Sequence, residues 1–320
     1  MRFVIRADAY RMSGAGHVMR SSVIAEELID RGYEVYFVGN LDEIPWVREY
    51  ISNLGFKGIY KPDGRFSTNN ITDTLILDSY EISITDPFIQ PKNWRKILVL
   101  VDDTNPSYVG DIYIHAGAET NWTKPKSQSI SVFFHGLEYL LIRKSLRNLK
   151  KEKKVKTNKE KIFLISAGGS DPFDFSQNLV KKLKSLNPIF HAYILAPEFE
   201  LPRMDSRFKF IKFGKEYEGL LDQIDYVFTT AGTSSWEYHF LDIPIALACA
   251  VQNQEHNYQY QISKAISWDL GYRLSNGSWN INETILEDLL SSNSPNLEKA
   301  LYGKAIVDGL GIYRILELIN

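Results

Sequence analysis

Short apolar runs alternate with longer amphipathic stretches along the first half of the chain. The runs are rich in Val, Ile, Leu and Phe, which favours β-strands, and the stretches between them are long enough for helices. The strands predicted in this way are Phe3–Ile5, Glu34–Val38, Leu75–Leu77, Ile97–Val101, Ile112–Ile114 and Val132–Phe134. Strands separated by helix-length segments are typical of a parallel sheet with helices on both faces. The pattern therefore predicts an α/β unit.

The pattern stops at a lysine-dense segment between Arg147 and Lys161 and then starts again. This segment is predicted to be an exposed linker, although an exposed helix end would have the same composition. The strands predicted after it are Ile162–Ile165, Ala192–Leu195, Phe208–Ile211, Tyr226–Thr229 and Ile245–Ala248. Helical spacing predicts helices over Phe175–Leu183 and Leu310–Ile319.

The sequence thus predicts three parts: an α/β domain over residues 1–148, a second over residues 149–306, and a C-terminal helix over residues 307–320. Ligands of open α/β sheets bind at the carboxyl ends of the strands. Two such domains facing one another are therefore expected to form a cleft that holds the ligand.

The first predicted strand is followed by a glycine-rich loop and a long amphipathic segment that opens with His17. Gly14 and Gly16 favour a tight turn, and the free N–H groups of a helix start can bind an anion. A histidine placed there can accept or donate a proton near neutral pH. Arg20 follows it in the same segment and is expected to bind substrate, as are Gly14, Gly16 and the later Asp78. The alternative is that the glycines only form a turn and that His17 caps the helix.

A second glycine loop, Gly168, Gly169 and Ser170, also lies between a predicted strand and a predicted helix. This context allows backbone N–H groups to bind a phosphate. The loop has neither the Lys-Ser or Lys-Thr pair of nucleoside-triphosphate loops nor the dinucleotide-binding spacing. A purely structural turn is the alternative.

A third loop, Gly232, Thr233 and Ser234, directly follows a predicted strand. Its small and hydroxyl residues can bring N–H and O–H groups against a diphosphate at a helix start. Glu237 lies about one helical turn after Ser234 and can reach a neighbouring sugar hydroxyl. A capping box formed by Ser234 and Glu237 fits the same residues.

Two more polar groups follow predicted strands. Asp78 and Tyr80 place a carboxylate and a phenol at the carboxyl end of one strand. Asn253 and Gln254 belong to an amide-rich segment after another strand, and amides both donate to and accept from sugar hydroxyls and acetamido groups. For the amide-rich segment, an ordinary polar loop is the alternative.

Composition narrows the range of functions. The net charge is −2, which indicates no general attraction to nucleic acid or to an anionic membrane. Cys249 is the only cysteine, so an intramolecular disulfide and a multi-cysteine metal site are excluded. No Asp-x-Asp triplet or close histidine pair supports a metal, and no cofactor motif is present. The absence of a leader or of a membrane-length apolar run favours a cytoplasmic protein.

The ordered motifs resemble the nucleotide-sugar hydrolase family of pseudaminic acid biosynthesis, the UDP-2,4-diacetamido-2,4,6-trideoxy-β-L-altropyranose hydrolases. These are related to spore-coat polysaccharide biosynthesis proteins and, more distantly, to the glycosyltransferase that makes lipid II. The resemblance rests on the segments 14–20, 78–80, 167–171, 231–237 and 253–254, and the motifs run in the family's order. It implies a GT-B fold of two Rossmann-like domains with the active site between them.

The resemblance also implies a metal-independent, inverting displacement of UDP by water at the anomeric carbon. His17 would be the general base, with Tyr80 near the reacting centre. Gly232, Thr233 and Ser234 would hold the diphosphate, Glu237 the ribose, and Asn253 and Gln254 the sugar. The dipole of a helix start would bias His17 toward its neutral form.

Ser79 stands where these hydrolases often carry histidine, which leaves the sugar and the acceptor open. A glycosyltransferase that uses the same donor is the first alternative. A non-catalytic nucleotide-sugar binding protein is the second. A UDP-sugar is the implied substrate in the first two cases, and association with other glycan-pathway enzymes also stays open.

Overall fold

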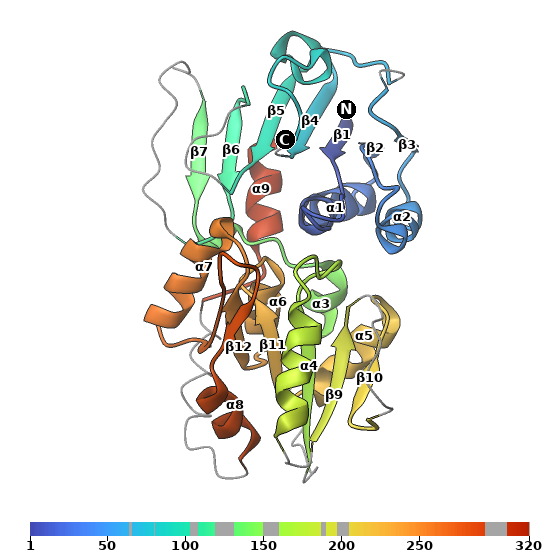
Figure 1. Cartoon of the computed structure of the whole chain (residues 1–320). Helices are drawn as coiled ribbons and strands as arrows, with labels where there is room; N and C mark the ends of the chain where they lie inside the picture. The colour runs from blue at the N-terminus through green and yellow to red at the C-terminus, as the bar shows by residue number, and fades with distance from the viewer. Residues whose placement is uncertain are drawn as a thin grey trace. The chain divides into compact units, whose positions relative to one another are not determined.

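The computed structural model describes residues 1–63, 66–79, 81–102, 108–118, 131–149, 160–186, 190–196, 205–291 and 306–319. The chain divides into two compact units (Figure 1). Unit 1 contains Met1–Lys144 together with Asp308–Asn320, and unit 2 contains Ser145–Val307. The final helix therefore belongs to the same unit as the N-terminus.

Unit 1 is built on a parallel sheet whose described strands lie in the order β3-β2-β1-β4-β5-β6-β7. The strands are β1 (Arg2–Ala7), β2 (Glu34–Val38), β3 (Gly58–Tyr60), β4 (Asp73–Asp78), β5 (Lys96–Leu100), β6 (Ile112–His115) and β7 (Val132–His135). The central strands are apolar along almost their whole length because both faces of the sheet are covered.

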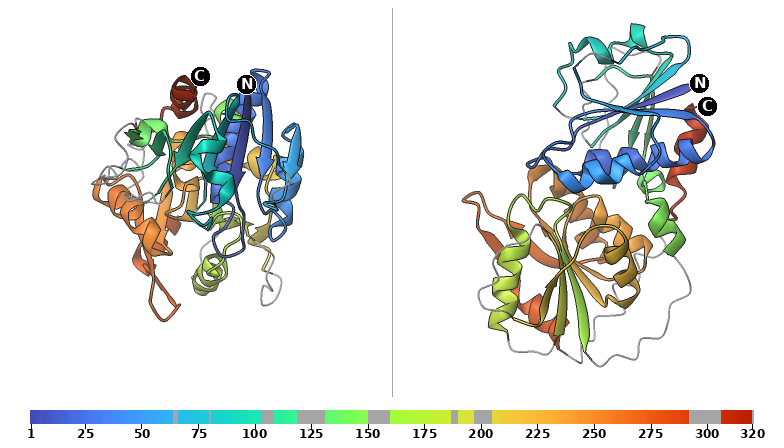
Figure 2. Two further views of the ribbon diagram at one scale, coloured as in Figure 1. Left: turned by 90° about the horizontal axis from the view of Figure 1, so that it is seen from above. Right: turned by 90° about the vertical axis from the view of Figure 1, so that its right-hand side faces the viewer.

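The two faces of this sheet carry different cores. On one face, α1 (Gly16–Asp30), α2 (Pro45–Ser52) and α9 (Gly311–Ile319) pack against the strands, as the right-hand view of Figure 2 shows for α1 and α9. On the other face, apolar side chains of β1, β4 and β5 pack with Trp94 and Tyr108. Short 3₁₀ turns, Pro87–Ile89, Pro91–Asn93 and Leu137–Tyr139, complete the unit.

Unit 2 repeats this plan in the order β10-β9-β8-β11-β12-β13-β14. Its strands are β8 (Lys161–Ser166), β9 (Phe190–Leu195), β10 (Phe208–Phe210), β11 (Tyr226–Thr230), β12 (Ile245–Cys249), β13 (Trp268–Arg273) and β14 (Trp279–Ile281). Its helices are α4 (Phe175–Ser185), α5 (Lys215–Leu220), α6 (Ser234–Phe240), α7 (Gln252–Ser263) and α8 (Glu283–Leu290), with a 3₁₀ turn at Leu221–Gln223. The last pair, β13 and β14, is antiparallel and departs from the parallel sheet that was predicted.

Both sheets reverse their strand order at one place, between β1 and β4 in unit 1 and between β8 and β11 in unit 2. Ligands of doubly wound folds bind at the carboxyl ends of the strands at such a switch point. Asp78 is the last residue of β4, and His17 lies in the first turn of the helix that follows β1. Gly168 and Gly232 lie in the loops that follow β8 and β11. The topology therefore places each predicted loop where its unit is expected to bind a ligand.

Every strand predicted from the apolar runs is present, with ends that differ by a few residues at most. The strands β3, β13 and β14 were not predicted because their sequences are short or contain polar and glycine residues. Helix α3 (Lys144–Leu149) occupies the beginning of the expected linker, and residues 150–159 lie outside the described part of the chain.

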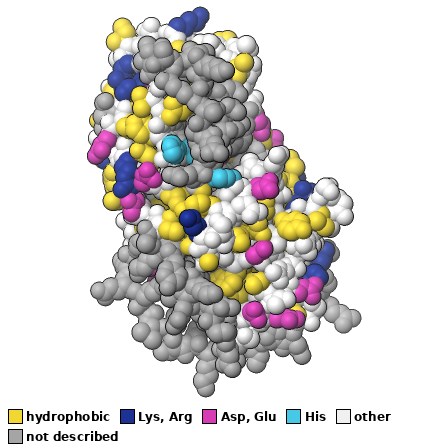
Figure 3. All heavy atoms as spheres, turned by 90° about the vertical axis from the view of Figure 1, so that its left-hand side faces the viewer, with side chains coloured by type: hydrophobic (Ala, Val, Ile, Leu, Met, Phe, Trp, Pro, Cys, Tyr) yellow, Lys and Arg dark blue, Asp and Glu magenta, His cyan; other side chains and the backbone are white. Residues whose placement is uncertain are grey.

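Two observations concern surfaces. On the face that Figure 3 shows, the described basic and acidic side chains are interspersed rather than gathered by sign. None of the described helices is long and apolar enough to cross a membrane.

Candidate functional site

His17 and Asp78 meet at the switch point of unit 1. His17 lies in the first turn of α1, and Asp78 is the last residue of β4. The imidazole Nδ1 is 2.7 Å from Oδ1 of Asp78. His17 is 9% exposed and Asp78 is fully buried. The structure thus pairs a histidine with a carboxylate that water does not reach.

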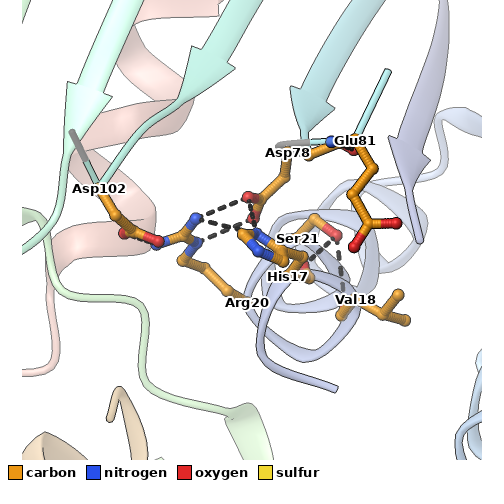
Figure 4. A network of polar contacts seen from close by, with 8 residues as sticks. His17, Val18, Arg20, Ser21, Asp78, Glu81 and Asp102 are labelled. Carbon is orange, nitrogen blue, oxygen red and sulfur yellow. Dashed lines mark hydrogen bonds and ion pairs between the residues drawn. The ribbon is translucent and has the colours of Figure 1, made fainter. Parts of the chain in front are cut away.

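Arg20 holds the carboxylate of Asp78 from the other side (Figure 4). Its Nε donates to Oδ2 of Asp78 at 2.8 Å, and its Nη2 donates to Oδ1 at 2.6 Å. Its Nη1 pairs with Asp102, which follows β5. His17 and Arg20 lie three residues apart and so share one face of α1. Arg20 was predicted to bind substrate, whereas its described polar contacts are made within unit 1.

The pKa of His17 is raised above its ordinary value. Burial of the imidazole lowers this pKa, but the charge and the hydrogen bond of Asp78 outweigh burial, with a smaller contribution from Asp102. Arg20 opposes the shift. The dipole of a helix start favours neutral histidine, and the adjacent carboxylate overrides that expectation.

The pairing fixes how His17 can act. A carboxylate only accepts hydrogen bonds, so the bond to Asp78 assigns the ring hydrogen to Nδ1. The lone pair is then on Nε2, which can take a proton from a reacting hydroxyl. Asp78 would also stabilise the imidazolium ion formed in that step, as the aspartate of a catalytic triad does.

The glycine loop before His17 contains one glycine that the backbone requires and one that it does not. Gly14 has φ of +79°, a conformation that favours glycine, and its N–H donates to the carbonyl of Tyr10 at 2.7 Å. Gly16 opens α1, is exposed, and has no atom within 4 Å of an added Cβ. His17 does not cap α1, because the N-cap is Ala15 and no side chain bonds there.

Tyr80, the second predicted catalytic residue, lies outside the described part of the chain. Its neighbour Ser79 is buried, and Oγ of Ser79 accepts the N–H of Glu81 at 3.1 Å. In the sequence, Tyr80 comes two residues after the buried Asp78.

The first glycine loop of unit 2 is anchored by a carboxylate that already occupies the helix start. Asp171 accepts the N–H groups of Phe175 and Ser176, both at 2.9 Å. Gly168, with φ of +75°, forms the preceding turn, and Gly169 and Ser170 are half-buried within it. Any phosphate contact here would come from the N–H groups of the turn, because those of Phe175 and Ser176 at the start of α4 already donate to Asp171.

The second loop of unit 2 does not form the capping box that its sequence allows. Helix α6 begins at Ser234, its N-cap is Thr233, and no side chain bonds at the cap. Gly232 and Gln254 lie close together, because an added Cβ on Gly232 would be 3.7 Å from Nε2 of Gln254. Asn253 is exposed beside Gln254, and Glu237 is buried on α6.

A buried polar network centred on Gln261 joins α6 to α7. Nε2 of Gln261 donates to Ser235 Oγ at 3.0 Å and to Asn257 Oδ1 at 3.1 Å. Its Oε1 lies 2.9 Å from both His239 Nε2 and Ser267 Oγ. Burial lowers the pKa of His239 to about 4, so this imidazole is neutral and can donate from Nε2.

The same network reaches the predicted diphosphate loop. Nδ2 of Asn257 donates to the carbonyl of Ala231 at 2.7 Å, one residue before Gly232. Neither this network nor the contacts of Arg20 with Asp78 were predicted from the sequence. The signal available was the spacing of polar residues on one helix face, at positions 17 and 20 and at positions 257 and 261.

The described residues include no group of three or more His, Cys, Asp or Glu side chains that could hold a metal ion.

No family model matches the chain. An uncharacterised protein of Methanocaldococcus jannaschii, MJ1062, is 28% identical over 290 residues, a match that covers 82% of this chain and 59% of MJ1062. The chain thus spans less than two thirds of that relative. The UDP-2,4-diacetamido-2,4,6-trideoxy-beta-L-altropyranose hydrolase of Campylobacter jejuni is 25% identical, with 85% of this chain and 100% of the relative covered. The spore coat polysaccharide biosynthesis protein SpsG of Bacillus subtilis is 23% identical, with 100% and 98% covered.

Solved structures share the fold at low sequence identity. MurG of Acinetobacter baumannii superimposes with a TM-score of 0.62 at 11% identity, covering 100% of this chain and 99% of MurG. Alr3699/HepE of Anabaena, solved with UDP and glucose, has a TM-score of 0.60 at 12% identity, with 100% and 99% covered. The predicted GT-B architecture is confirmed. In sequence the chain is similar to the Campylobacter hydrolase and to Bacillus SpsG, and in fold it is similar to the solved GT-B structures.

Proposed function

We propose that this chain is an enzyme that acts on a nucleotide-linked sugar, and that it hydrolyses the anomeric C–O bond of a UDP-linked amino-deoxy sugar to free sugar and UDP. The observation that carries the proposal is the buried pair of His17 and Asp78 at the switch point of unit 1. The printed activity of the Campylobacter relative supports the choice of substrate.

In the proposed reaction, Nε2 of His17 accepts a proton from water as the water oxygen attacks the anomeric carbon. The new C–O bond forms on the face opposite UDP, the bond to the diphosphate oxygen breaks, and the configuration inverts. Asp78 fixes the ring and stabilises the imidazolium ion, while Arg20 holds Asp78 in place. A positioned base contributes about 10²–10⁴-fold to the rate. The proposal assigns no step to a metal ion or cofactor.

The nucleotide is proposed to bind unit 2. Gly232, Thr233 and Ser234 would contact the diphosphate, and Glu237 the ribose. The closeness of Gly232 to Gln254 supports this part, because it brings two of the predicted segments to one place. Asn253 and Gln254 would then contact the sugar.

The remaining predicted contacts belong to the same proposal. Gly168, Gly169 and Ser170 would contact the ligand through their turn. In unit 1, Gly14 and Gly16 would line the substrate beside His17, and Tyr80 would lie near the reacting centre. The open space at Gly16 supports its part.

A second candidate function is transfer of the sugar to a hydroxyl of another molecule. It is favoured by the likeness to MurG and to CalG4, the calicheamicin glycosyltransferase, whose TM-score is 0.58. A base held as His17 is held can deprotonate an alcohol as well as water.

Incubation with candidate UDP-sugars, followed by mass spectrometry of the products, separates the two functions. Equal amounts of UDP and free sugar without any acceptor are expected for the hydrolase, whereas turnover only with an added acceptor would replace it by the transferase. His17→Ala should lower kcat by about 10²–10⁴-fold, with UDP affinity in calorimetry unchanged. His191→Ala, at an exposed histidine of unit 2, is the matched control. Equal loss of UDP binding in His17→Ala would contradict the assigned role.

A further inference from the structure

A second buried pair of opposite charges lies at the end of β1. Nη1 of Arg6 is 2.7 Å from Oδ1 of Asp8, and the two side chains are 6% and 4% exposed. Arg6 is in β1, and Asp8 directly follows the strand. Neither residue has a part in the mechanism given above.

The pair lies beside Asp78 in the sheet. The Cα of Ala7 is the register partner of Asp78 across β1 and β4, and the Cα of Arg6 is the partner of Leu77. Side chains alternate between the faces of a strand, so Arg6 lies on the sheet face opposite Ala7. This is the face whose core contains Leu77 and Tyr108, whereas α1, which carries His17, covers the other.

Part of this pair has no partner among the residues that the structure describes. Nη1 of Arg6 contacts Asp8 and the carbonyl of Val38 at 3.5 Å. Oδ1 of Asp8 also accepts the N–H of Asn40 at 2.8 Å. The described residues provide no acceptor for Nε and Nη2 of Arg6, and no donor for Oδ2 of Asp8. These three atoms are not among the described side-chain atoms that are both shut off from solvent and without a partner, so a group that enters from outside can reach them.

Stability alone is a poor reason to bury such a pair. Replacing a buried ion pair by apolar residues of similar size is often neutral or stabilising. Further polar groups gather around it. The charge of Asp8 contributes to the raised pKa of Tyr10, after the larger effect of burial. Ser79 is buried, and its side chain acts on the pKa of Tyr108 together with the charges of Arg6 and Asp8, after the larger effect of burial, which raises that pKa. Polar groups gathered at a switch point are typical of a ligand site.

We propose that Arg6 and Asp8 form a subsite for a neutral hydrogen-bonding substituent of the sugar, a hydroxyl or an amide. Nε and Nη2 of Arg6 donate to its oxygen, and Oδ2 of Asp8 accepts its O–H or N–H. A carboxylate in the same place would face Asp8 and be repelled, since Arg6 is already neutralised. The inference rests on the proposed function, because it concerns the sugar of the same substrate.

Calorimetry with UDP, UDP-N-acetylglucosamine and UDP-glucuronate tests the subsite. In the unchanged protein, UDP-N-acetylglucosamine should bind at least about tenfold more tightly than UDP, which is the effect of about one good hydrogen bond to a charged group. UDP-glucuronate should bind no more tightly than UDP. Arg6→Met and Asp8→Asn should both remove the gain of the acetamido sugar and leave UDP affinity unchanged.

Two further variants serve as a conservative replacement and as a control. Arg6→Lys should restore part of the gain, because lysine keeps a donor. Arg2→Met removes a pair with Asp73 at the opposite end of β1 and should leave every affinity unchanged. In Asp8→Asn, where the repelling charge is gone, UDP-glucuronate should bind more tightly than in the unchanged protein.

The outcomes are distinguishable. If Arg6→Met and Asp8→Asn bind UDP normally and keep the sugar-dependent gain, the subsite is disproved, and a fall in melting temperature alone assigns the pair a structural role. If Arg6→Met does not fold, Asp8→Asn decides the question through the acetamido sugar and the glucuronate. If the unchanged protein binds neither UDP nor any UDP-sugar, the proposed function itself is disproved.

Discussion

Nδ1 of His17 lies 2.7 Å from Oδ1 of Asp78, although 61 positions separate the two residues in the sequence. The contact exists because β1 and β4 are neighbours in the sheet while α1 starts directly after β1. It pairs a histidine in the first turn of α1 with a buried carboxylate, which assigns the ring hydrogen to Nδ1. The consequences of this contact can be measured.

Asp78→Asn should lower kcat by about 10²–10⁴-fold, because an amide can hold the ring in the wrong tautomer. It should also move the acid limb of the pH profile of kcat/KM to lower pH. The base acts only when deprotonated, and Asp78 is the main cause that raises the pKa of His17. Asp42→Asn, at an exposed ion pair, is the control. An unchanged acid limb would show that His17 is not the titrating base.

Gly16→Ala tests whether a glycine is needed at this position for the backbone or for the approach of a ligand. An added methyl group meets no atom within 4 Å, so the free energy of unfolding should stay within about 1 kcal/mol of the unchanged protein or rise. If the substrate approaches this position, kcat/KM should fall at least about tenfold, equivalent to 1.4 kcal/mol. Full activity in Gly16→Ala would remove Gly16 from the site.

Gly14→Ala is the matched comparison for that experiment. Its φ of +79° strains an alanine, so this variant should lose about 1 kcal/mol or more of stability. Urea unfolding measures both variants. Equal stability of the two would contradict the different backbone roles assigned to the two glycines.

His239 should make unit 2 less stable in acid. Its pKa in the folded protein is about 4 against an ordinary 6.5, so between these values the unfolded chain binds a proton that the folded chain does not. The contribution of His239 to the free energy of unfolding is complete above about pH 6.5. It falls as the pH decreases toward 4, by about 3 kcal/mol in total.

Urea unfolding of the unchanged protein and of His239→Gln at pH 7 and pH 4.5 measures this contribution. Glutamine keeps a donor for Gln261 and does not titrate, so the variant should lose less stability between the two pH values. His191→Gln, at an exposed histidine, should behave like the unchanged protein. The same loss in all three proteins would refute the assignment to His239.

Asp171→Ala should destabilise unit 2 by about 0.5–2 kcal/mol, because the carboxylate caps two N–H groups at the start of α4. Asp171→Asn keeps one acceptor oxygen and should lose less. Thermal unfolding followed by circular dichroism measures both, with UDP affinity as a second readout. If Asp171→Ala weakens UDP binding without loss of stability, the carboxylate serves the ligand rather than the helix.

The apolar runs predicted the strands well because their residues are buried on both faces, as for Leu75–Leu77 at the centre of the first sheet. The strand β13 escaped detection because Asp269 and Gly271 interrupt its apolar pattern. Its antiparallel partner β14 is only three residues long. The edges of a sheet are less buried and therefore carry a weaker signal.

The contact between His17 and Asp78 could not be predicted from the sequence. His17 and Asp78 were both singled out, since each follows a predicted strand. Their contact depends on the order of strands in the sheet, which periodicity does not determine. Arg6 and Asp8 are visible in the sequence as two charges at the end of an apolar strand. That they lie beside Asp78 follows only from the register of β1 with β4.

Helix α9 has a consequence for the order in which the chain can fold during synthesis. Ile312, Ile315 and Ile319 of α9 are fully buried in the core that also contains Phe3 and Val18. The ribosome makes all of unit 2 before it makes α9. Unit 2 therefore has its complete sequence first, whereas the unit that carries His17 must keep part of its core uncovered until the last helix emerges.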